Sequence, residues 1–298
     1  MTYREQSKDV TRTVGKLGII AGDGPLPVLL ASVCAATSSP FFVIRLDGIT
    51  ARDEAFGADE ICGLGEAGKM IRLLKENRCD RVVMAGLVSR PDFRSLKLDM
   101  KGTLLLPRVI KAAATGDGAL LDVLVAVLEE EGMEVIGADE VASDLSFPKG
   151  VLTAASPSTE ALQDIAKAAR LIAALDPFDV GQGCVVANGL VMAVEAAEGT
   201  DAMLSRCAEL PRSIFGAAAE HTGVLVKCPK PSQELRVDLP TVGVETLKGA
   251  KAAGLSGVAV AAGRALLMDR QAAIAYADEH GLFLFGFKET DLQLSEDH

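Results

Sequence analysis

The sequence predicts an α/β protein with two domains, a Rossmann-like domain with a parallel sheet followed by a mixed α/β domain. The chain of 298 residues is long enough for two domains that each bury a core. Through the first half, short and continuously apolar runs alternate with helical patterns, which is typical of a parallel sheet covered on both faces. The second half is richer in Ala and Gly and less regular.

The first half repeats a strand followed by a helix. Apolar runs predict strands at residues 17–21, 41–47, 80–86 and 133–137. Helices are predicted from about Pro25, over residues 65–79, and from just past Asp117. This alternation predicts a Rossmann-like layer over residues 16–150, preceded by a loose tail at residues 1–15.

A boundary is predicted within residues 146–158, where turn residues cluster. Ser156 followed by Pro157 offers an N-cap and a proline at the first helical position, so a helix is expected to run to about Leu175. Further apolar stretches follow at residues 181–196, 223–226, 254–263 and 282–287. They predict a second, mixed α/β domain over residues 151–298.

Composition excludes several classes of protein. The 30 basic residues less the 41 acidic ones give a net charge of −11, so there is no overall basic surface for nucleic acid. The six cysteines contain no C-x-x-C pair, which favours buried, reduced thiols over disulfides or structural zinc. Neither a signal peptide nor an 18-residue apolar run is found, so we expect a cytoplasmic protein.

The string GDGPLP at residues 22–27 follows the first predicted strand and opens a helix. Gly22, Gly24, Pro25 and Leu26 are candidates for substrate binding, because backbone amides at a helix N-terminus suit a phosphate. Pro27 stands where a G-x-G-x-x-G motif has its third glycine. A tight strand-to-helix turn therefore remains the alternative.

A second string, GLGEAGKM at residues 63–70, nearly matches the P-loop pattern. Met70 replaces the hydroxyl residue that would hold Mg²⁺, and the preceding GADEIC is a poor buried strand. We interpret this string as a loop that caps the next helix, and we reject an ATPase.

Two further segments supply candidates for substrate binding. Gly86, Ser89 and Arg90 follow a predicted strand at its carboxyl end, where open α/β sheets bind ligands. Thr115 and Gly116 lie at a small-residue entry to a helix. A surface salt bridge explains the arginine, and simple helix capping explains the second segment, equally well.

The second half carries two polar segments. In the first, acids follow an apolar strand, and each alone is explained as a solvated turn residue; its polar residues are Gln182, Glu195, Glu198 and Asp201. The second follows residues 223–226 and is interrupted by three prolines; its polar residues are Lys227, Lys230, Gln233, Glu234, Arg236 and Asp238. Together the acids could bind Mg²⁺ and the cations a pyrophosphate, but a stiff connecting loop stays open as the alternative.

Three strings together resemble one family: LGIIAGDGPLP, DVGQGCVVANGLVMAVEAAEGTDAM and VLVKCPKPSQELRVDLPTVGVETL. They resemble the LpxI-type UDP-2,3-diacylglucosamine pyrophosphatases of lipid A biosynthesis, from about Lys16 to Phe287. The resemblance implies Mg²⁺-dependent hydrolysis of UDP-2,3-diacylglucosamine to UMP and 2,3-diacylglucosamine 1-phosphate (lipid X). It also implies a nucleotide-facing first domain and a lipid-facing second domain.

The resemblance also implies roles for residues. The family's acidic and basic loop corresponds to the six polar residues from Lys227 to Asp238, a Gln-Gly element to Gln182, and a Gly-Thr-Asp element to Thr200 and Asp201. Asp238, Glu234 and Asp201 would hold Mg²⁺ or activate water. The catalytic set implied by the resemblance is Asp238, Glu234, Lys227, Lys230, Arg236 and Gln233. Glu234 stands where the family pattern more often has Asp, so Asp238 is expected to be the essential acid.

The implied partner is a lipid-linked UDP-sugar, met in transient contact with the inner face of the inner membrane; a homodimer is left open. Two other classes remain as alternatives. One is a non-catalytic protein that binds a sugar nucleotide or lipid. The other is a nicotinamide-dependent oxidoreductase, based on the turn at Gly22 and an acid, Asp47, that closes the second strand.

Overall fold

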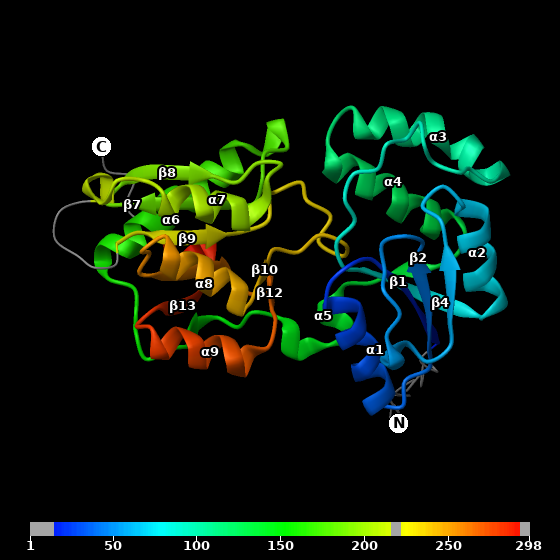
Figure 1. The fold of residues 1–298 in the computed structure, drawn as a ribbon, viewed down its shortest axis with the longest axis horizontal. Helices are drawn as coiled ribbons and strands as arrows, with labels where there is room; N and C mark the ends of the chain where they lie inside the picture. Colours follow the sequence, from blue (N-terminus) through cyan, green and yellow to red (C-terminus); the bar gives the residue numbers. More distant parts are fainter. Residues whose placement is uncertain (1–14, 216–221, 293–298) are drawn as a thin grey trace, which may run out of the picture. The chain divides into compact units, whose positions relative to one another are not determined.

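A computed structural model of the chain describes residues 15–215 and 222–292 (Figure 1). The predicted tail at residues 1–15 lies outside this part of the chain except for its last residue. The described residues form two compact units. One contains the chain up to Pro107 together with Val125–Ile136, and the other contains Arg108–Leu124 together with the chain from Gly137.

The first unit contains a parallel sheet of five strands in the order β3-β2-β1-β4-β5, the order of the Rossmann fold. The strands are β1 (Lys16–Ala21), β2 (Phe41–Leu46), β3 (Asp59–Cys62), β4 (Cys79–Ala85) and β5 (Glu134–Val135). The helices α1 (Leu26–Ala36) and α2 (Ala67–Glu76) and a 3-10 turn at Glu54–Phe56 belong wholly to this unit. The helices α3 (Met100–Ala113) and α4 (Asp117–Glu130) each have residues in both units. Figure 1 shows α1 and α2 on opposite sides of the sheet, as right-handed crossovers require. The predicted Rossmann-like parallel sheet is therefore confirmed, whereas its bounds at residues 16 and 150 stay a prediction.

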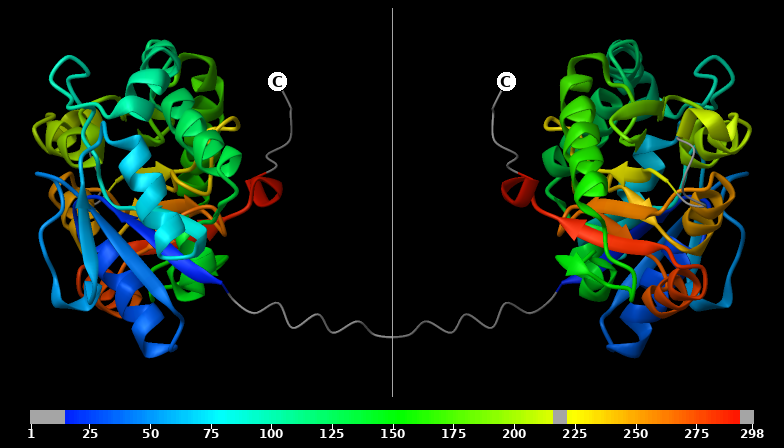
Figure 2. Two further views of the ribbon diagram at one scale, coloured as in Figure 1. Left: turned by 90° about the vertical axis from the view of Figure 1, so that its right-hand side faces the viewer. Right: turned by 90° about the vertical axis from the view of Figure 1, so that its left-hand side faces the viewer.

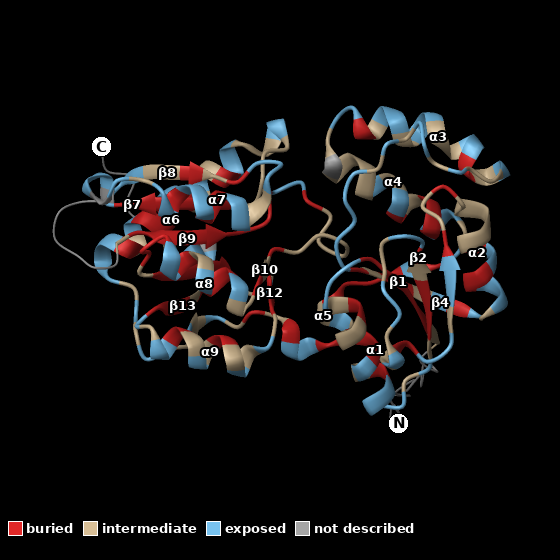
Figure 3. Cartoon of the chain, in the orientation of Figure 1, coloured by how far each residue is buried: buried red, intermediate tan, exposed pale blue. Residues whose placement is uncertain are grey.

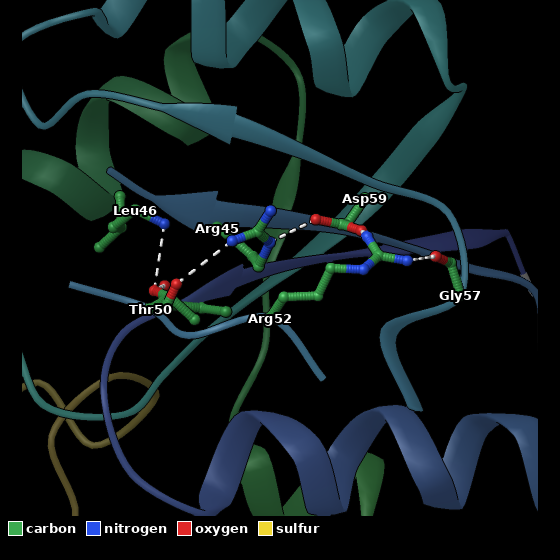
Figure 4. Close-up of polar contacts among 7 residues, drawn as sticks. Arg45, Leu46, Thr50, Arg52, Gly57 and Asp59 are labelled. Atoms are coloured by element: carbon green, nitrogen blue, oxygen red, sulfur yellow. Dashed lines mark hydrogen bonds and ion pairs between the residues drawn. The ribbon is translucent and has the colours of Figure 1, made fainter. Parts of the chain in front are cut away.

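Charged side chains tie the outer strands of this sheet together (Figure 4). The carboxylate of Asp59 on β3 pairs with Arg45 on β2 and with Arg52 in the loop between the two strands. Thr50 in the same loop donates to the carbonyl of Ala21, the last residue of β1, and accepts from the backbone N–H of Leu46 at 3.1 Å. These bonds fix the loop after β2 against the carboxyl end of β1.

Three local features differ from the sequence-based expectations or sharpen them. The segment GADEIC, interpreted as a poor strand, contains β3, which is an edge strand and leaves Glu60 and Ile61 exposed. Helix α3 has no counterpart among the predicted elements. The glycine string before α2 packs internally, and the N–H of Lys69 in the first turn donates to the Asp99 carboxylate at 2.9 Å. The other Asp99 carboxylate oxygen accepts from the N–H of Gly102 at 2.7 Å, so this carboxylate joins the start of α2 to the start of α3.

The second unit is built on a mixed sheet of six strands in the order β6-β13-β11-β9-β7-β8. Its strands are β6 (Gly150–Val151), β7 (Gly183–Ala187), β8 (Leu190–Val194), β9 (Val224–Lys227), β11 (Gly257–Ala261) and β13 (Phe283–Phe287). A small parallel pair is formed by β10 (Thr241–Val242) and β12 (Leu266–Leu267). The four predicted apolar stretches of the second half all form strands, and the mixed α/β character is confirmed.

Helices cover both faces of this sheet. One face packs against α6 (Thr159–Ala174), the long green helix in Figure 2. Its Ile165 and Ile172 are buried in one cluster with Val224 and Val226 of β9. The other face packs against α7 (Gly199–Ala208), α8 (Val244–Ala252) and α9 (Arg270–Glu279). The shorter helical segments are α5 (Ala138–Val141) and the 3-10 turns Ser143–Leu145, Asp176–Phe178, Arg212–Phe215 and Glu289–Leu292. The N-cap of α6 is Ser158, whose hydroxyl accepts from the N–H of Ala161, so the cap lies two residues after the predicted one at Ser156.

The cysteines and the helix lengths agree with the sequence. All six cysteines are buried and free. Burial raises the pKa of the Cys184 thiol to about 12, so this group stays protonated at neutral pH. Over the part of the chain that the structure describes, every helix is too short or too polar to cross a bilayer.

Candidate functional site

The carboxyl edge of the parallel sheet brings two of the predicted glycines together. The chain segments that follow β1 and β4 are joined by a pair of 2.8 Å backbone hydrogen bonds between Asp23 and Leu87. A Cβ atom on Gly22 would lie 2.7 Å from the carbonyl oxygen of Leu87, and one on Gly86, whose φ is +94°, would lie 2.5 Å from that of Asp23. Both positions therefore require glycine for the approach of the two backbones at the point where the strand order reverses.

The other candidates in the first unit lie around the same edge. Gly24 has a φ of +92°, and the helix α1 begins two residues later, at Leu26, directly after Pro25. The N-cap residue Pro25 offers no side-chain hydrogen bond to the first turn of α1, and the backbone N–H groups of that turn suit an anion. Ser89 and Arg90 are exposed in the loop after β4. This arrangement is compatible with binding of a diphosphate at the sheet edge.

Strand register explains why three polar residues of the second unit share one sheet edge. Lys227, the last residue of β9, is the register partner of Gly183, the first residue of β7. Gln182 therefore lies just outside this edge. The end of β8 pairs with the start of β7, which places Glu195 at the same edge. The backbone N–H of Cys228 donates to the Gln182 carbonyl at 3.0 Å, so the edge continues into the loop after β9.

Lys227 carries a buried ammonium group. Lys227 belongs to β9, a strand in which every residue is buried (Figure 3), and the lysine itself is only 5% exposed. The Nζ atom donates to the Thr200 hydroxyl at 2.7 Å and to the Thr241 carbonyl at 3.4 Å. The Thr200 hydroxyl in turn donates to a carboxylate oxygen of Glu195 at 2.8 Å. The lysine is thus held by neutral oxygens with an acid one step away.

Two electrostatic effects shift the pKa of Lys227 in opposite directions. Burial lowers the pKa of this lysine, because the ammonium form loses hydration. The carboxylates of Glu195, Asp201 and Asp238 favour the ammonium form and raise the pKa. The net shift of the Lys227 pKa is downward, so the effect of burial is larger than that of the acids.

Gln233 acts as a strut for the loop after β9. It is 8% exposed, and its carbonyl oxygen accepts from the backbone N–H of Lys230 at 3.0 Å. Its amide nitrogen donates to the side-chain oxygen of Gln182 at 2.9 Å and to the backbone carbonyl of Asp238 at 2.7 Å. The two predicted residues Gln182 and Gln233 are therefore in direct contact, and one amide fixes both ends of the loop.

Lys230 is paired with an acid that sequence reasoning missed. Its Nζ atom forms an ion pair with Asp179, which has a left-handed backbone with a φ of +51°. The second carboxylate oxygen of Asp179 accepts from the backbone N–H of Gly118 at 3.3 Å. A Cβ atom on Gly116 would lie 2.1 Å from that oxygen, so the predicted segment Thr115–Gly116 closely approaches the partner of Lys230.

Glu234 and Arg236 pair with each other. The guanidinium donates to both carboxylate oxygens of Glu234, at 2.9 and 2.6 Å, and the backbone N–H of Arg236 adds a third bond at 3.1 Å. These hydrogen bonds lower the pKa of Glu234. The arrangement orients Arg236, and Glu234 would have to leave it to bind a metal ion.

Asp238 differs from the other acids of the loop. Burial raises its pKa, and the acids Asp179 and Glu195 add to this effect, while Lys230 and Lys227 lower the pKa. None of the hydrogen bonds between described residues ends on its carboxylate. This half-buried acid is therefore available to accept a hydrogen bond from a water molecule or to bind a cation.

The donor set fits Mg²⁺ only as a site shared with a substrate. Within residues 15–215 and 222–292, no group of three His, Cys, Asp or Glu side chains is arranged to hold a metal. Mg²⁺ commonly takes one or two carboxylates together with substrate phosphates. Asp238 and the exposed Asp201, in the first turn of α7, would supply these two carboxylates, since both act on Lys227.

The residues missed by the sequence analysis are the partners of the lysines. Asp179 was part of the DVGQG string, but its ordinary charge gave no sign of its left-handed backbone or its pairing with Lys230. Glu195 was noticed as one of four polar residues and was not assigned to the site. Thr241 contributes only a backbone carbonyl, which no side-chain pattern reveals.

Comparisons with known proteins match both halves of the chain. Residues 16–145 match the family described as the LpxI N-terminal domain, and residues 148–285 match the LpxI C-terminal domain. The chain is 50% identical over 273 residues to a protein of Caulobacter vibrioides named UDP-2,3-diacylglucosamine pyrophosphatase LpxI, covering 91% of this chain and 97% of that relative.

A search of solved structures gave a remote likeness to N5-carboxyaminoimidazole ribonucleotide synthetase from Thermotoga maritima. The two share 15% identity with a TM-score of 0.19, and the match covers 70% of this chain and 44% of the other. This likeness is too slight to bear on the fold or the site.

Proposed function

Since the chain belongs to the LpxI family, we propose that it hydrolyses the pyrophosphate bond of UDP-2,3-diacylglucosamine. One water molecule is added, and the products are UMP and 2,3-diacylglucosamine 1-phosphate, in a step of lipid A biosynthesis. The observation that carries this proposal within the structure is the pair of buried lysines at and just after the end of β9, together with Asp238, which accepts no hydrogen bond from the described residues. Cations placed against developing charge are the main requirement of phosphoanhydride hydrolysis.

The residues of the second unit divide into two roles. Asp238 orients or deprotonates the attacking water, for which a raised pKa makes it a better base than an ordinary aspartate. Lys227, Lys230 and Arg236 stabilise negative charge on the phosphate that leaves. Gln233 and Glu234 keep the loop and the guanidinium in position.

Mg²⁺ dependence is a further part of the proposal. Asp238 and Asp201 would hold the ion together with substrate phosphates, and Glu234 would join them only by releasing Arg236. When bound, the ion would polarise the phosphate oxygens and lower the pKa of a bound water. The residues of the chain would still have to orient that water and balance the remaining charge.

The candidates of the first unit are proposed to bind the uridine diphosphate part. The N-terminus of α1 offers N–H groups to a phosphate, and Gly22 and Gly86 let the backbone come close. In the second unit, Thr115, Gly116, Gln182 and Thr200 are proposed to line the substrate through the contacts described above.

Contact with a membrane surface is proposed because the acyl chains of the substrate reside in one, at the inner face of the inner membrane. A candidate surface is α3, where Met100 and Leu104 are 84% and 75% exposed one turn apart. Arg94 and Lys97, just before this helix, are exposed and suit anionic lipid. Replacing both apolar residues by glutamine should reduce flotation with phosphatidylglycerol vesicles, whereas Leu190→Gln should not. The homodimer stays a prediction, which sedimentation velocity would test.

The decisive experiment follows the products. Purified protein incubated with UDP-2,3-diacylglucosamine and Mg²⁺ should release UMP and the lipid 1-phosphate in equal amounts. A protein that binds the substrate without releasing UMP would instead be a sugar-nucleotide or lipid-binding protein. Release of UDP in place of UMP would show cleavage of a different bond and would overturn the proposal.

A further inference from the structure

Glu195 is a buried acid that the proposed chemistry does not yet use. It is 7% exposed, and within residues 15–215 and 222–292 its Oε2 atom has no hydrogen-bond partner. Two glycines enclose it: a Cβ atom on Gly183 would lie 2.3 Å from Oε2, and one on Gly181 would lie 2.0 Å from the backbone oxygen of Glu195. Burying a carboxylate with one oxygen unsatisfied destabilises a fold unless something compensates.

The compensating charge is Lys227, reached through one hydroxyl. Glu195 and Lys227 form no direct ion pair within the described chain. Instead, the Thr200 hydroxyl accepts from the lysine at 2.7 Å and donates to Glu195 at 2.8 Å. Both charged residues are more than nine-tenths buried. A buried ammonium and a buried carboxylate are thus connected by a bridge that requires a hydroxyl able to accept and donate at once.

This bridge leaves part of the ammonium for a ligand. An ammonium has three N–H groups. One is used by Thr200, and a second makes a long contact of 3.4 Å with the Thr241 carbonyl. The third has no acceptor among the described residues. The bridge therefore restricts the rotation of the lysine without consuming its capacity to bind an anionic oxygen.

We propose that Glu195 is a positioning residue, which acts through Thr200 to hold the Lys227 ammonium in place and to balance its charge when no phosphate is bound. The inference rests on the proposed function for the identity of the anion, a diphosphate. Glu195 itself touches no reacting atom in this scheme. A substrate phosphate would approach the lysine from the side opposite its hydroxyl bridge.

A simple structural role is a weaker explanation of the same contacts. Thr200 lies in the first turn of α7, but its hydroxyl is bonded to Glu195 and does not cap the helix. A glutamine at position 195 would supply an equally good acceptor to Thr200 without a buried charge. The structure therefore predicts that the charge, and not only the hydrogen bond, is required.

Variants of the bridge test this directly. Glu195→Gln keeps the acceptor and removes the charge, Thr200→Val removes the hydroxyl at similar size, and Thr200→Ser restores it. We expect kcat for UMP release to fall about ten- to a hundredfold in Glu195→Gln and in Thr200→Val, the range typical of residues that orient a reacting group. Thr200→Ser should stay within about threefold of the parent. Glu209→Gln, an exposed acid next to the same helix, is the matched control and should leave kcat unchanged.

Two further measurements separate positioning from folding. The double variant Glu195→Gln, Thr200→Val should be no slower than Thr200→Val alone. The losses of activity do not add, because both substitutions break the same chain of hydrogen bonds. Glu195→Gln removes one acid of a buried pair of charges, so its thermal midpoint is expected to fall, and kcat is therefore compared at a temperature at which every variant stays folded. Full activity of Glu195→Gln, or multiplied losses in the double variant, would overturn the inference.

A readout without substrate keeps the inference independent of the proposed function. The Lys227 ammonium can be titrated by NMR in protein with ¹³C-labelled lysine and assigned by its absence in Lys227→Met. Glu195, Asp201 and Asp238 all raise the pKa of this lysine, so Glu195→Gln should lower it, while Glu209→Gln should not. An unchanged Lys227 titration contradicts the inference, whereas a parent protein that releases no UMP contradicts only the proposed function.

Discussion

Replacing Asp238 by asparagine should abolish turnover and, at neutral pH, stabilise the fold. The substitution keeps the shape of the side chain and removes its charge. Burial raises the pKa of Asp238 above its ordinary value of 3.8, so the folded protein binds this proton more tightly than the unfolded chain. Each unit of such a shift corresponds to about 1.4 kcal/mol.

The sign of the effect on stability follows from proton linkage. Between pH 3.8 and the raised pKa, the folded state carries more protons than the unfolded state, so stability falls as the pH rises through this window. At pH 7 the ionised carboxylate therefore subtracts its full penalty from the free energy of unfolding. Asp238→Asn removes that penalty, so we expect a higher free energy of unfolding at pH 7 and a gain that vanishes at about pH 3.5, where the carboxyl group is protonated in both states.

Two assays check this prediction. Urea unfolding of the parent and of Asp238→Asn at both pH values measures the difference in free energy of unfolding, with Glu209→Gln as a control. Release of UMP should fall by at least about 10²-fold, the usual contribution of a general base. Near-normal turnover would refute the catalytic assignment. A less stable variant at pH 7 would refute the reasoning from burial.

Three further outcomes are expected. Gln233→Leu removes all three side-chain hydrogen bonds of a buried strut, so the free energy of unfolding measured in urea should fall by about 1–3 kcal/mol; an unchanged midpoint would show that the loop needs no strut. Gly116→Ala would place a Cβ atom 2.1 Å from an Asp179 carboxylate oxygen and should raise the KM for the substrate, whereas a Cβ atom on Gly118 would lie at an ordinary 3.6 Å, so Gly118→Ala should not. UMP release should stop in EDTA and return when Mg²⁺ is added in excess, and activity that persists in EDTA would contradict the proposed metal dependence.

The strands were predictable wherever burial made a continuous apolar run. Strand β1 lies in the middle of its sheet and β9 in the middle of the other, and both appear in the sequence as apolar runs. Edge strand β3 failed this test, because its Glu60 and Ile61 face solvent and break the run. Helix α3 also escaped prediction, since the exposed Met100 and Leu104 and an internal proline obscure the usual separation of apolar and polar faces.

The site was predictable as a set of residues but not as a set of contacts. Lys227 and Thr200 are 27 positions apart, and Lys230 and Asp179 are 51 apart, so only the folded sheet edge shows that they meet. The pairing of Glu234 with Arg236 is local, yet the sequence equally allowed Glu234 to face a metal ion. Charge and spacing define the residue types of a site, whereas the strand register decides which of them become partners.

The position of β9 in the sheet explains both the burial of the Lys227 charge and its proposed role in catalysis. The strand lies between β7 and β11 and is hydrogen-bonded on both sides, so Lys227 at its end cannot move toward solvent without disrupting the sheet. The same burial that lowers the pKa of this lysine also keeps water from screening its charge. A cation on a mobile surface loop would be easier to hydrate, but it would have to be ordered again whenever a phosphate bound. Because the ammonium is fixed at the end of a strand, the free-energy cost of ordering it is met once, during folding. A charge that is already ordered before the reaction stabilises a transition state best.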